Sequence, residues 1–504
     1  MSFSDLSHEL VWAILGLVPK RDVPSVSLVC RTWQFIAFPL LYRTVALVDA
    51  DHAQYLIRRV LRGSNDRARR VPTCVRRLYI RTGISEELSS SLKPFISKLR
   101  NLRYLYWDAT YLRQRQLWYD VLACLHETAP ELRSLSLVVP GNCFMDSEKV
   151  AALTNLQELS IKFKAWSGDS HPSTRVPTEI VDLIRGASNI ESLRLEFEEN
   201  HKAISGSHEF WLSTDLFSIL AQYHFPNLRR LRVSSRFLAP FDSAGGSGFR
   251  RFLSTHDQLR VIGLDSSYYR LSPEPELAPL SMSPQDISAL MPSVQHFEGP
   301  CVMFEALLRS ELVGQLQVLT LVESKNIIEL GSCKDLLPRL GDLTLSKLSS
   351  LKSLRIYSRS VTWRAVVAGL AKFVEATPVL EELLIGDLAR RSFLPQVLDE
   401  CLDVLKKLPN LHTLGIPVCH GLGCNTTYLP KSFLLRAGGT CPRLDRIYQM
   451  YADWHGRWDI LRRGGSGEPF GVIYKERSSR RSLWNLLEGV THPPWQLSHE
   501  AGDF

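Results

Sequence analysis

The sequence lacks any long apolar run. Across 504 residues, no stretch approaches the roughly 20 consecutive apolar residues of a membrane-spanning helix, although apolar residues make up 45% of the chain. Its first residues mix apolar and acidic side chains as a helical module does, which is not the pattern of a signal peptide. Ten scattered cysteines are typical of reduced thiols. We therefore expect a protein of the cytoplasm, the nucleus or both, without membrane contact.

Catalytic and cofactor signatures are also missing. Gly-x-Ser-x-Gly, His-Glu-x-x-His and the paired-glycine nucleotide motif do not occur. The glycine-rich residues 464–467 lack the Lys-Ser/Thr and the helix of a phosphate loop, so a hairpin turn is predicted there. The metal-capable residues that lie near one another are Cys419, His420, Cys424, His412 and Cys441. Their spacing matches no usual zinc pair. We expect no catalytic residue, metal or cofactor, with an enzyme whose site lies in loops as an alternative.

An excess of positive charge is present. The formal net charge is +8, and arginines concentrate in Arg58–Arg81 and Lys475–Arg481. Asp66 interrupts the first cluster, which favours a solvated helix face. Nucleic-acid binding is a less favoured alternative, because such a surface combines basic patches with stacking aromatic residues.

Short amphipathic helices are predicted at the amino end. Leu6, Leu10, Ile14 and Leu17 recur at the spacing of one helical stripe, and Pro19 stops that helix.

A second helix is predicted after Asp22, and a third over about residues 34–38, ended by Pro39. The apolar face of the second helix is predicted to hold Val26, Val29, Cys30 and Trp33. Three helices of this length, in a module of about 40 residues, cannot bury all of their apolar side chains. The excess apolar surface therefore needs a partner.

Two short motifs give this module a resemblance to a known family. Residues 6–10 read Leu-Ser-His-Glu-Leu and residues 29–33 read Val-Cys-Arg-Thr-Trp, which resembles the F-box, with Ser7 where the usual proline stands. The resemblance implies docking on a Skp-type adaptor and, through it, on a cullin. It implies that the residues that contact or support the adaptor interface are Leu6, Leu10, Ile14, Leu28, Val29 and Trp33. A helical cap on a larger domain is the alternative.

A repeated L-x-x-L-x-L pattern covers most of the remaining chain. Clear copies end at Trp107, Leu137, Ile161, Leu195, Val233, Leu264, Leu321, Leu345, Ile356, Ile385 and Ile416. Weaker copies lie at Ile80, near Phe297 and near Ile447. Most copies follow one another at intervals from the low twenties to the high thirties of residues, which is the signature of a solenoid.

Each repeat is predicted to form a strand and then a helix. The L-x-L end of each copy alternates between apolar and other residues as a strand does. In four of the intervals between copies, apolar residues recur at the period of a helix. A first strand is predicted at residues 43–47 and a helix over residues 52–61. Strands joined through helices run parallel. The pattern resembles leucine-rich repeats, although the usual Asn or Cys after the last leucine is missing almost throughout.

The expected fold class is therefore α/β. A three-helix F-box module over residues 1–43 precedes a right-handed leucine-rich-repeat-like solenoid over residues 44–450, with parallel strands inside and helices outside. Residues 451–504 are predicted to form a cap with a β-hairpin. No Gly/Ser-rich or Pro-rich linker separates the first two parts. An ordinary α/β domain with a parallel sheet is the alternative.

These features favour a substrate-recognition subunit of an SCF-type ubiquitin ligase, in which the chain itself is not an enzyme. The side chains between the strand leucines are expected to face an unknown target protein. They are Tyr106, Lys162, Arg194, Glu196, Arg232, Asp265, Arg355 and Tyr357. Loops rich in Ser, Gly and Pro are expected at one rim, as binding elements or as variable connections: 165–178, 198–209, 239–248 and 266–285. The alternative is a non-catalytic interaction scaffold that joins no ligase.

Overall fold

The structure is a computed structural model of the whole chain. The residues that it describes are 6–18, 22–63, 66–81, 86–110, 115–140, 150–164, 177–198, 216–234, 248–265, 283–300, 303–322, 348–357, 363–386, 395–417, 429–450, 455–463 and 467–477. The described chain divides into two compact units, with the boundary between Leu228 and Arg229.

Three helices open the first unit: α1 (His8–Leu17), α2 (Val23–Val26) and α3 (Arg31–Tyr42). Ser7 caps α1, because its hydroxyl accepts a hydrogen bond from the Leu10 N–H. The Cys30 sulfur accepts one from the Trp33 N–H at the start of α3.

Two details of the predicted helices are wrong. The second helix ends at Val26, so Val29 and Cys30 lie outside it and Trp33 lies on α3. The third helix continues through Pro39 to Tyr42. The turns after Pro39 are stabilised by packing, since Leu40 and Leu41 lie against the core of the module and the Phe38 and Tyr42 rings are 4.7 Å apart. This packing outweighs the hydrogen bond that a proline removes from a helix.

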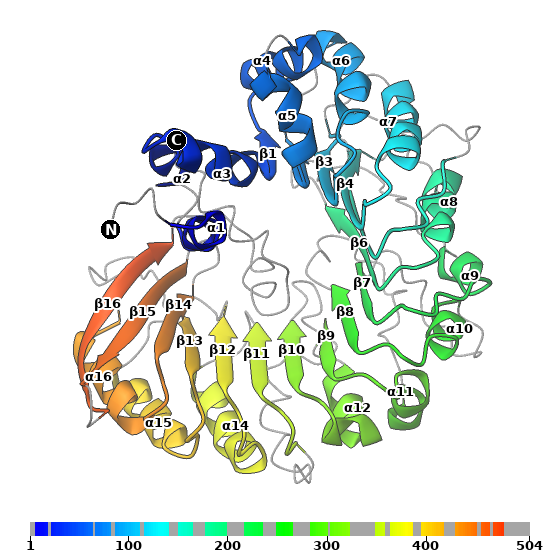
Figure 1. Cartoon of the computed structure of the whole chain (residues 1–504). Coiled ribbons are helices and arrows are strands. Elements are labelled where there is room, and N and C mark those ends of the chain that lie inside the picture. Colours follow the sequence, from blue (N-terminus) through cyan, green and yellow to red (C-terminus); the bar gives the residue numbers. More distant parts are fainter. Residues whose placement is uncertain are drawn as a thin grey trace, which may run out of the picture. The chain divides into compact units, whose positions relative to one another are not determined.

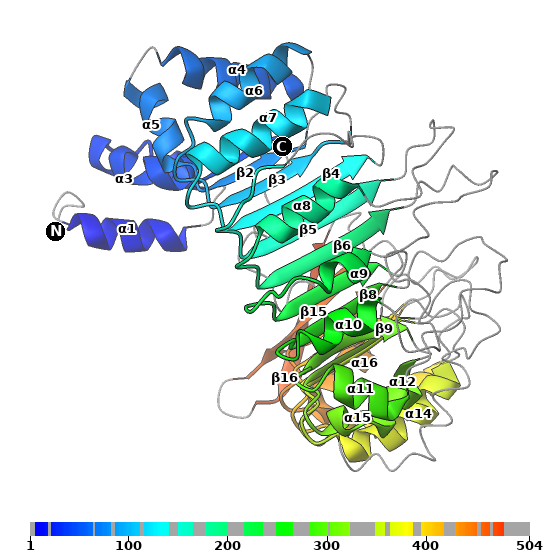
Figure 2. The same cartoon turned by 90° about the vertical axis from the view of Figure 1, so that its right-hand side faces the viewer.

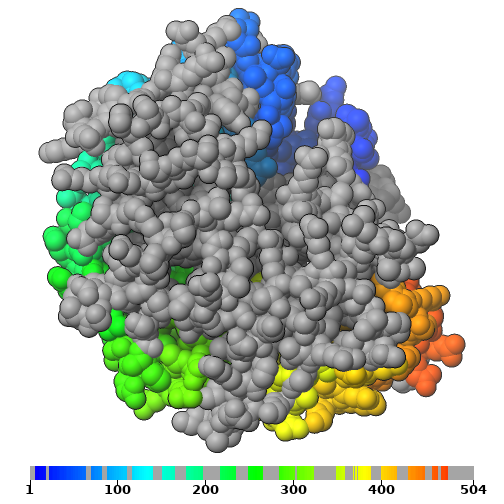
Figure 3. All heavy atoms as spheres, turned by 180° about the vertical axis from the view of Figure 1, so that it is seen from behind, coloured from blue at the N-terminus to red at the C-terminus, as the bar shows by residue number. Residues whose placement is uncertain are grey.

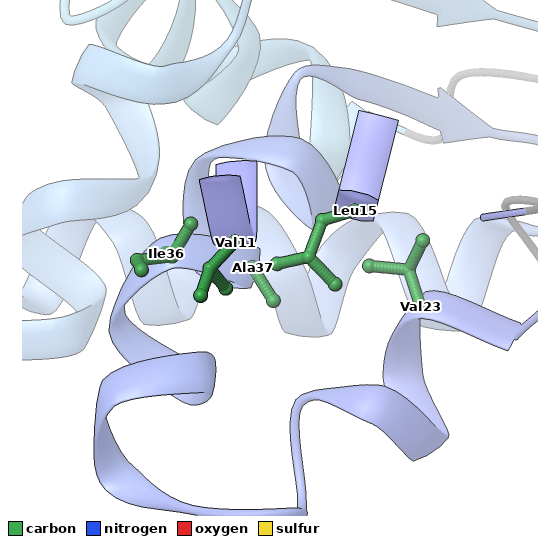
Figure 4. Close-up of a cluster of buried hydrophobic side chains, with 5 residues drawn as sticks. All are labelled: Val11, Leu15, Val23, Ile36 and Ala37. Atoms are coloured by element: carbon green, nitrogen blue, oxygen red, sulfur yellow. The ribbon is translucent and has the colours of Figure 1, made fainter. Parts of the chain in front are cut away.

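A small apolar core holds these helices together. Val11 and Leu15 of α1, Val23 of α2, and Ile36 and Ala37 of α3 are buried against one another (Figure 4). Burying a side chain of this size contributes about 1.5–3 kcal/mol for Val, Leu or Ile. The core therefore fixes which face of α1 points inward.

Strands and connecting helices make up the rest of the first unit, with two helices between β1 and β2 (Figure 1). The strands are β1 (Thr44–Leu47), β2 (Arg77–Ile80), β3 (Tyr104–Asp108), β4 (Ser134–Pro140), β5 (Glu158–Lys164) and β6 (Ser192–Glu198). The helices are α4 (Ala50–Arg62), α5 (Asp66–Cys74), α6 (Glu86–Ile96), α7 (Arg115–Thr128), α8 (Thr178–Gly186) and α9 (Leu216–Leu220). Consecutive strands pair in parallel, and Figure 2 shows α7 and α8 over one face of them.

The second unit repeats this plan and ends in a hairpin. Its strands are β7 (Arg230–Ser234), β8 (Val261–Asp265), β9 (His296–Pro300), β10 (Val318–Val322), β11 (Ser353–Tyr357), β12 (Glu382–Gly386), β13 (Thr413–Pro417), β14 (Arg446–Met450), β15 (His455–Arg462) and β16 (Pro469–Arg477). Its helices are α10 (Gly248–Ser254), α11 (Pro284–Leu290), α12 (Phe304–Arg309), α14 (Trp363–Ala376), α15 (Pro395–Leu405) and α16 (Lys431–Thr440), with a 3₁₀ turn η5 (Glu311–Gly314).

Strands β7 to β14 pair in parallel, whereas β14, β15 and β16 pair antiparallel. The predicted hairpin is thus confirmed. In Figure 3, residues of the second unit appear at the surface, coloured from green to orange by residue number.

The leucine positions of the repeat form the core of each unit. In the first unit, Leu78, Leu105, Leu135, Leu159 and Leu193 stand in register on neighbouring strands and are buried. In the second, the register runs through Leu231, Ile262, Phe297, Leu319, Leu354, Leu383, Leu414 and Ile447, so the weaker copies are strands too. The copy ending at Leu345 lies outside the described residues, and β10 pairs directly with β11. The predicted α/β solenoid is confirmed.

Asparagine joins the repeats at a place that the sequence analysis did not anticipate. Just before the first leucine-type position of a repeat, an Asn amide donates to a carbonyl near the end of the preceding repeat. The pairs are Asn101 with Thr73 (2.8 Å), Asn155 with Pro130 (3.0 Å), Asn189 with Thr154 (3.1 Å) and Asn410 with Pro378 (3.1 Å). These bonds link successive repeats, as does the ladder of strand hydrogen bonds.

We predict that Asn155→Ala lowers the free energy of unfolding by about 0.5–1.5 kcal/mol, because the Pro130 carbonyl loses its side-chain donor. Asn227→Ala is the matched control, since Asn227 holds the same position in its repeat but makes no side-chain hydrogen bond within the described residues. Urea unfolding followed by tryptophan fluorescence measures both variants. Equal shifts for the two would contradict this role of Asn155.

Candidate functional site

Several apolar side chains of the N-terminal module lie outside its core and are exposed. Leu10, Ile14 and Leu17 of α1 are 54%, 40% and 87% exposed. Leu28 and Val29, in the turn between α2 and α3, are 79% and 63% exposed. We call these five residues the exposed apolar set. Large apolar side chains in water are unfavourable, and such a set marks an interaction surface.

The helical geometry of α1 explains why these side chains face outward. Each residue turns about 100° around the helix axis. Val11 and Leu15 point into the core, whereas Leu10 and Ile14 lie to one side of them (Figure 4 shows the buried pair). Of the predicted stripe, Leu10, Ile14 and Leu17 are exposed whereas Leu6 packs against the core, and sequence reasoning missed Val11 and Leu15. Which face of α1 is buried depends on how α2 and α3 pack against it, and the sequence of α1 alone does not show this packing.

The other two residues of the proposed adaptor site lie deeper. Leu6 and Trp33 are partly buried and pack against the core of Val11, Leu15, Val23, Ile36 and Ala37. Leu6 and Trp33 therefore stabilise the packing of the helices. The other four residues, Leu10, Ile14, Leu28 and Val29, are exposed and can contact a partner. The six residues thus divide into an exposed part and a supporting part.

The residues expected to face a target in the first unit lie on strands and are half-buried. Tyr106 of β3 lies next to the Arg81 guanidinium, which is 5.2 Å from the ring centre. Lys162 is on β5. Arg194 and Glu196, both on β6, form an ion pair with each other. This face therefore offers aromatic and charged groups of both signs.

Among the corresponding residues of the second unit, Arg232 is half-buried and pairs with a buried glutamate. Arg232 on β7 reaches across Gly263 on β8 to Glu298 on β9, where its nitrogen lies 3.7 Å from the carboxylate. Gly263 permits this path, because a Cβ there would lie 2.8 Å from the Arg232 Cγ. Asp265 ends β8.

Arg355 and Tyr357 of β11 are buried. Arg355 donates to the Glu382 carboxylate at 2.7 Å, and the Ser353 hydroxyl donates to the same oxygen at 2.6 Å. Burial raises the pKa of the Tyr357 hydroxyl above its usual value. Arg355 and Tyr357 are only 4% and 3% exposed, so in this conformation they contribute to the interior of the unit and not to a surface that a target could contact.

Metal-capable and thiol groups are dispersed. The described residues contain no cluster of His, Cys, Asp and Glu that could hold a metal ion; Cys419, His420 and Cys424 lie outside them. Burial raises the pKa of the Cys401 thiol to about 12 and that of Cys441 to about 11, so both stay protonated at neutral pH. Within the described ranges, no helix is long and apolar enough to cross a bilayer.

The surroundings of His296 disfavour its protonated form. Burial, followed by the charges of Arg355 and Arg232, lowers the pKa of His296 below 6.5. As pH falls through 6.5, the unfolded chain therefore binds a proton that the folded chain does not, and the free energy of unfolding decreases. We predict that His296→Gln removes this part of the acid dependence, a slope of at most about 1.4 kcal/mol per pH unit.

Denaturant unfolding of the wild type and His296→Gln between neutral and mildly acidic pH measures the difference. Parallel pH dependences for the two proteins would show that His296 does not titrate in this way.

Comparison with known proteins identifies the N-terminal module. The sequence matches the F-box-like family over residues 3–48. Among solved structures, the chain is similar to one described as the crystal structure of the Rad7 and Elc1 complex in yeast, with 16% identity, coverage of 85% of this chain and 91% of that chain, and a TM-score of 0.42. No curated protein matches the sequence. The three helices that present the exposed apolar set, together with β1, are an F-box-like domain.

Proposed function

We propose that the chain is the substrate-recognition subunit of an SCF-type E3 ubiquitin ligase. In this proposal the F-box-like domain docks on a Skp-type adaptor and, through it, on a cullin, while the repeat units bind a target protein. The observation that carries the proposal is the exposed apolar set on a domain whose core is already complete without it.

Burial of this set is sufficient to drive docking. Each Leu or Ile that moves from water into an interface contributes about 1.5–3 kcal/mol. A few such anchors commonly dominate the binding energy of an interface. The small apolar core beneath them reduces the ordering cost, because α1 is held in place before the partner arrives.

The repeats fit a receptor role in two ways. Their parallel strands hold side chains at fixed spacing on a rigid framework. Tyr106, Lys162, Arg194 and Glu196 supply a mixed polar and aromatic surface in the first unit. We propose that the chain performs no chemistry itself, needs no cofactor, and works in the cytoplasm, the nucleus or both, with ubiquitin transfer carried out by its partners.

We predict that Leu10→Asp combined with Ile14→Asp weakens binding to a Skp-type adaptor by at least about 100-fold, because two anchors are lost and two charges are introduced into the interface. Val48→Asp combined with Tyr55→Asp is the matched control, since both residues are exposed and apolar but lie outside the set. Isothermal titration of purified adaptor with each variant measures the effect.

Circular dichroism and thermal unfolding check that both double variants stay folded. Unchanged adaptor affinity in Leu10→Asp/Ile14→Asp would contradict the docking surface. No adaptor binding by the wild type would instead favour a scaffold that joins no ligase.

A further inference from the structure

Arginines recur at the start of successive strands in the first unit. One arginine directly precedes each of the strands β1, β2, β3 and β4. These residues are Arg43, Arg76, Arg103 and Arg133. The sequence separates them by 27 residues or more. The fold brings them to one edge of the sheet, where neighbouring strands are about 4.8 Å apart.

Backbone hydrogen bonds hold this arginine row in register. The Arg43 carbonyl accepts bonds from the Arg76 and Arg77 N–H groups at 2.9 and 3.0 Å. The Arg76 carbonyl accepts two from the next repeat at 2.8 and 3.1 Å, and the Arg103 carbonyl accepts two at 3.0 Å. The spacing of the row is therefore set by the fold before any ligand binds.

A cavity of about 750 Å³ opens along the row. Its charged lining is Arg43, Arg70, Arg76, Arg77, Arg103, Arg133 and Glu158. Trp12, Pro39 and Leu40 add apolar surface from α1 and α3. Six arginines against one glutamate make this a strongly positive pocket, and its volume falls within the usual range of ligand pockets.

Much of this positive charge is not neutralised within the protein. Glu131 lies beside the pocket and pairs with Arg103 at 2.9 Å and with Arg76 at 3.8 Å. Arg43 and Arg77 make no side-chain hydrogen bond or ion pair within the described residues, and Arg133 is exposed. A ligand that supplies negative charge would therefore reach Arg43 and Arg77 without first breaking an ion pair of these two residues.

Arg70 has a different neighbour. Its guanidinium lies over the rings of Phe35 and Phe38, 4.6 and 5.1 Å from their centres. This stacking positions the Arg70 group while leaving its charge available.

The pocket and the exposed apolar set occupy opposite flanks of α1. Trp12 is two residues from both Leu10 and Ile14, which places it about 160° away from each around the helix axis. A partner bound through Leu10 and Ile14 thus leaves the Trp12 side open. The pocket does not depend on whether the chain joins a ligase.

We propose that this pocket binds an acidic peptide segment of a protein partner. The row from Arg43 to Arg133 spans three strand spacings, about 14 Å, which equals about four residues of extended chain. The planar forks of arginine match carboxylates. Trp12 and Leu40 offer contacts to apolar side chains of the same segment, which a single inorganic anion would not use.

Fluorescence polarisation with the intact chain tests the proposal. The probe is a fluorescein-labelled peptide, Leu-Glu-Asp-Glu-Asp-Leu, and the control probe carries lysine in place of each acidic residue. We expect the acidic probe alone to bind, and Arg43→Glu combined with Arg133→Glu to weaken its affinity by at least about tenfold, since like charges then face it.

Arg229→Glu combined with Arg260→Glu is the matched control. Both residues are exposed and hold the same repeat position in the second unit, where each carbonyl again accepts two N–H groups from the next repeat, but neither lines the pocket. This variant is expected to keep the affinity within about twofold. Should charge reversal unfold the chain, Arg43→Gln with Arg133→Gln tests the same contacts with less perturbation.

Equal affinity in the pocket variant and its control would overturn the proposal. Failure of the acidic peptide to bind would also overturn the proposal. This includes the case in which inorganic polyphosphate or single-stranded DNA binds through Arg43 and Arg133 while the peptide does not. Adaptor binding measured in parallel is expected to be unaffected by the pocket variant, which separates this result from the fate of the docking surface.

Discussion

The packing of Val11 and Leu15 against α2 and α3 is the contact on which the proposed function depends. It is a small core, formed by side chains that each contribute only a few kcal/mol. Yet it fixes the rotation of α1, and that rotation decides which side chains meet water. Leu10, Ile14 and Leu17 are turned outward as a consequence, and Trp12 is turned to the arginine-lined pocket.

Both units use one backbone device to place side chains. In both units, the carbonyl of a residue just before a strand accepts two N–H groups from the next repeat, as that of Arg103 does in the first unit and that of Arg260 in the second. Residues far apart in the sequence are thereby stacked at a constant spacing along one edge of the sheet. When the same residue type recurs at this position, its side chains form a continuous surface of one chemical kind. The arginine row, which is positively charged, is an example.

The sequence predicted the elements that carry a local signal. The L-x-L strands within the described residues, the helix predicted over residues 52–61 and the C-terminal hairpin follow from periodicity and turn residues, and the structure contains them. Pro39 misled the prediction for α3, because tertiary packing outweighs the local cost of a proline. The Asn155 bond and the arginine row had no signal within a single repeat, since their partners lie in the neighbouring repeat. The burial of Arg355 likewise depends on neighbouring strands and could not be read from its own segment.

The most direct measurement of the central claim is amide hydrogen exchange of the chain alone and with a Skp-type adaptor. The account predicts slower exchange in α1 and in residues 27–30 when the adaptor is present, because burial of the exposed apolar set stabilises the backbone beneath it. A stable complex in which exchange in both segments is unchanged would contradict the account.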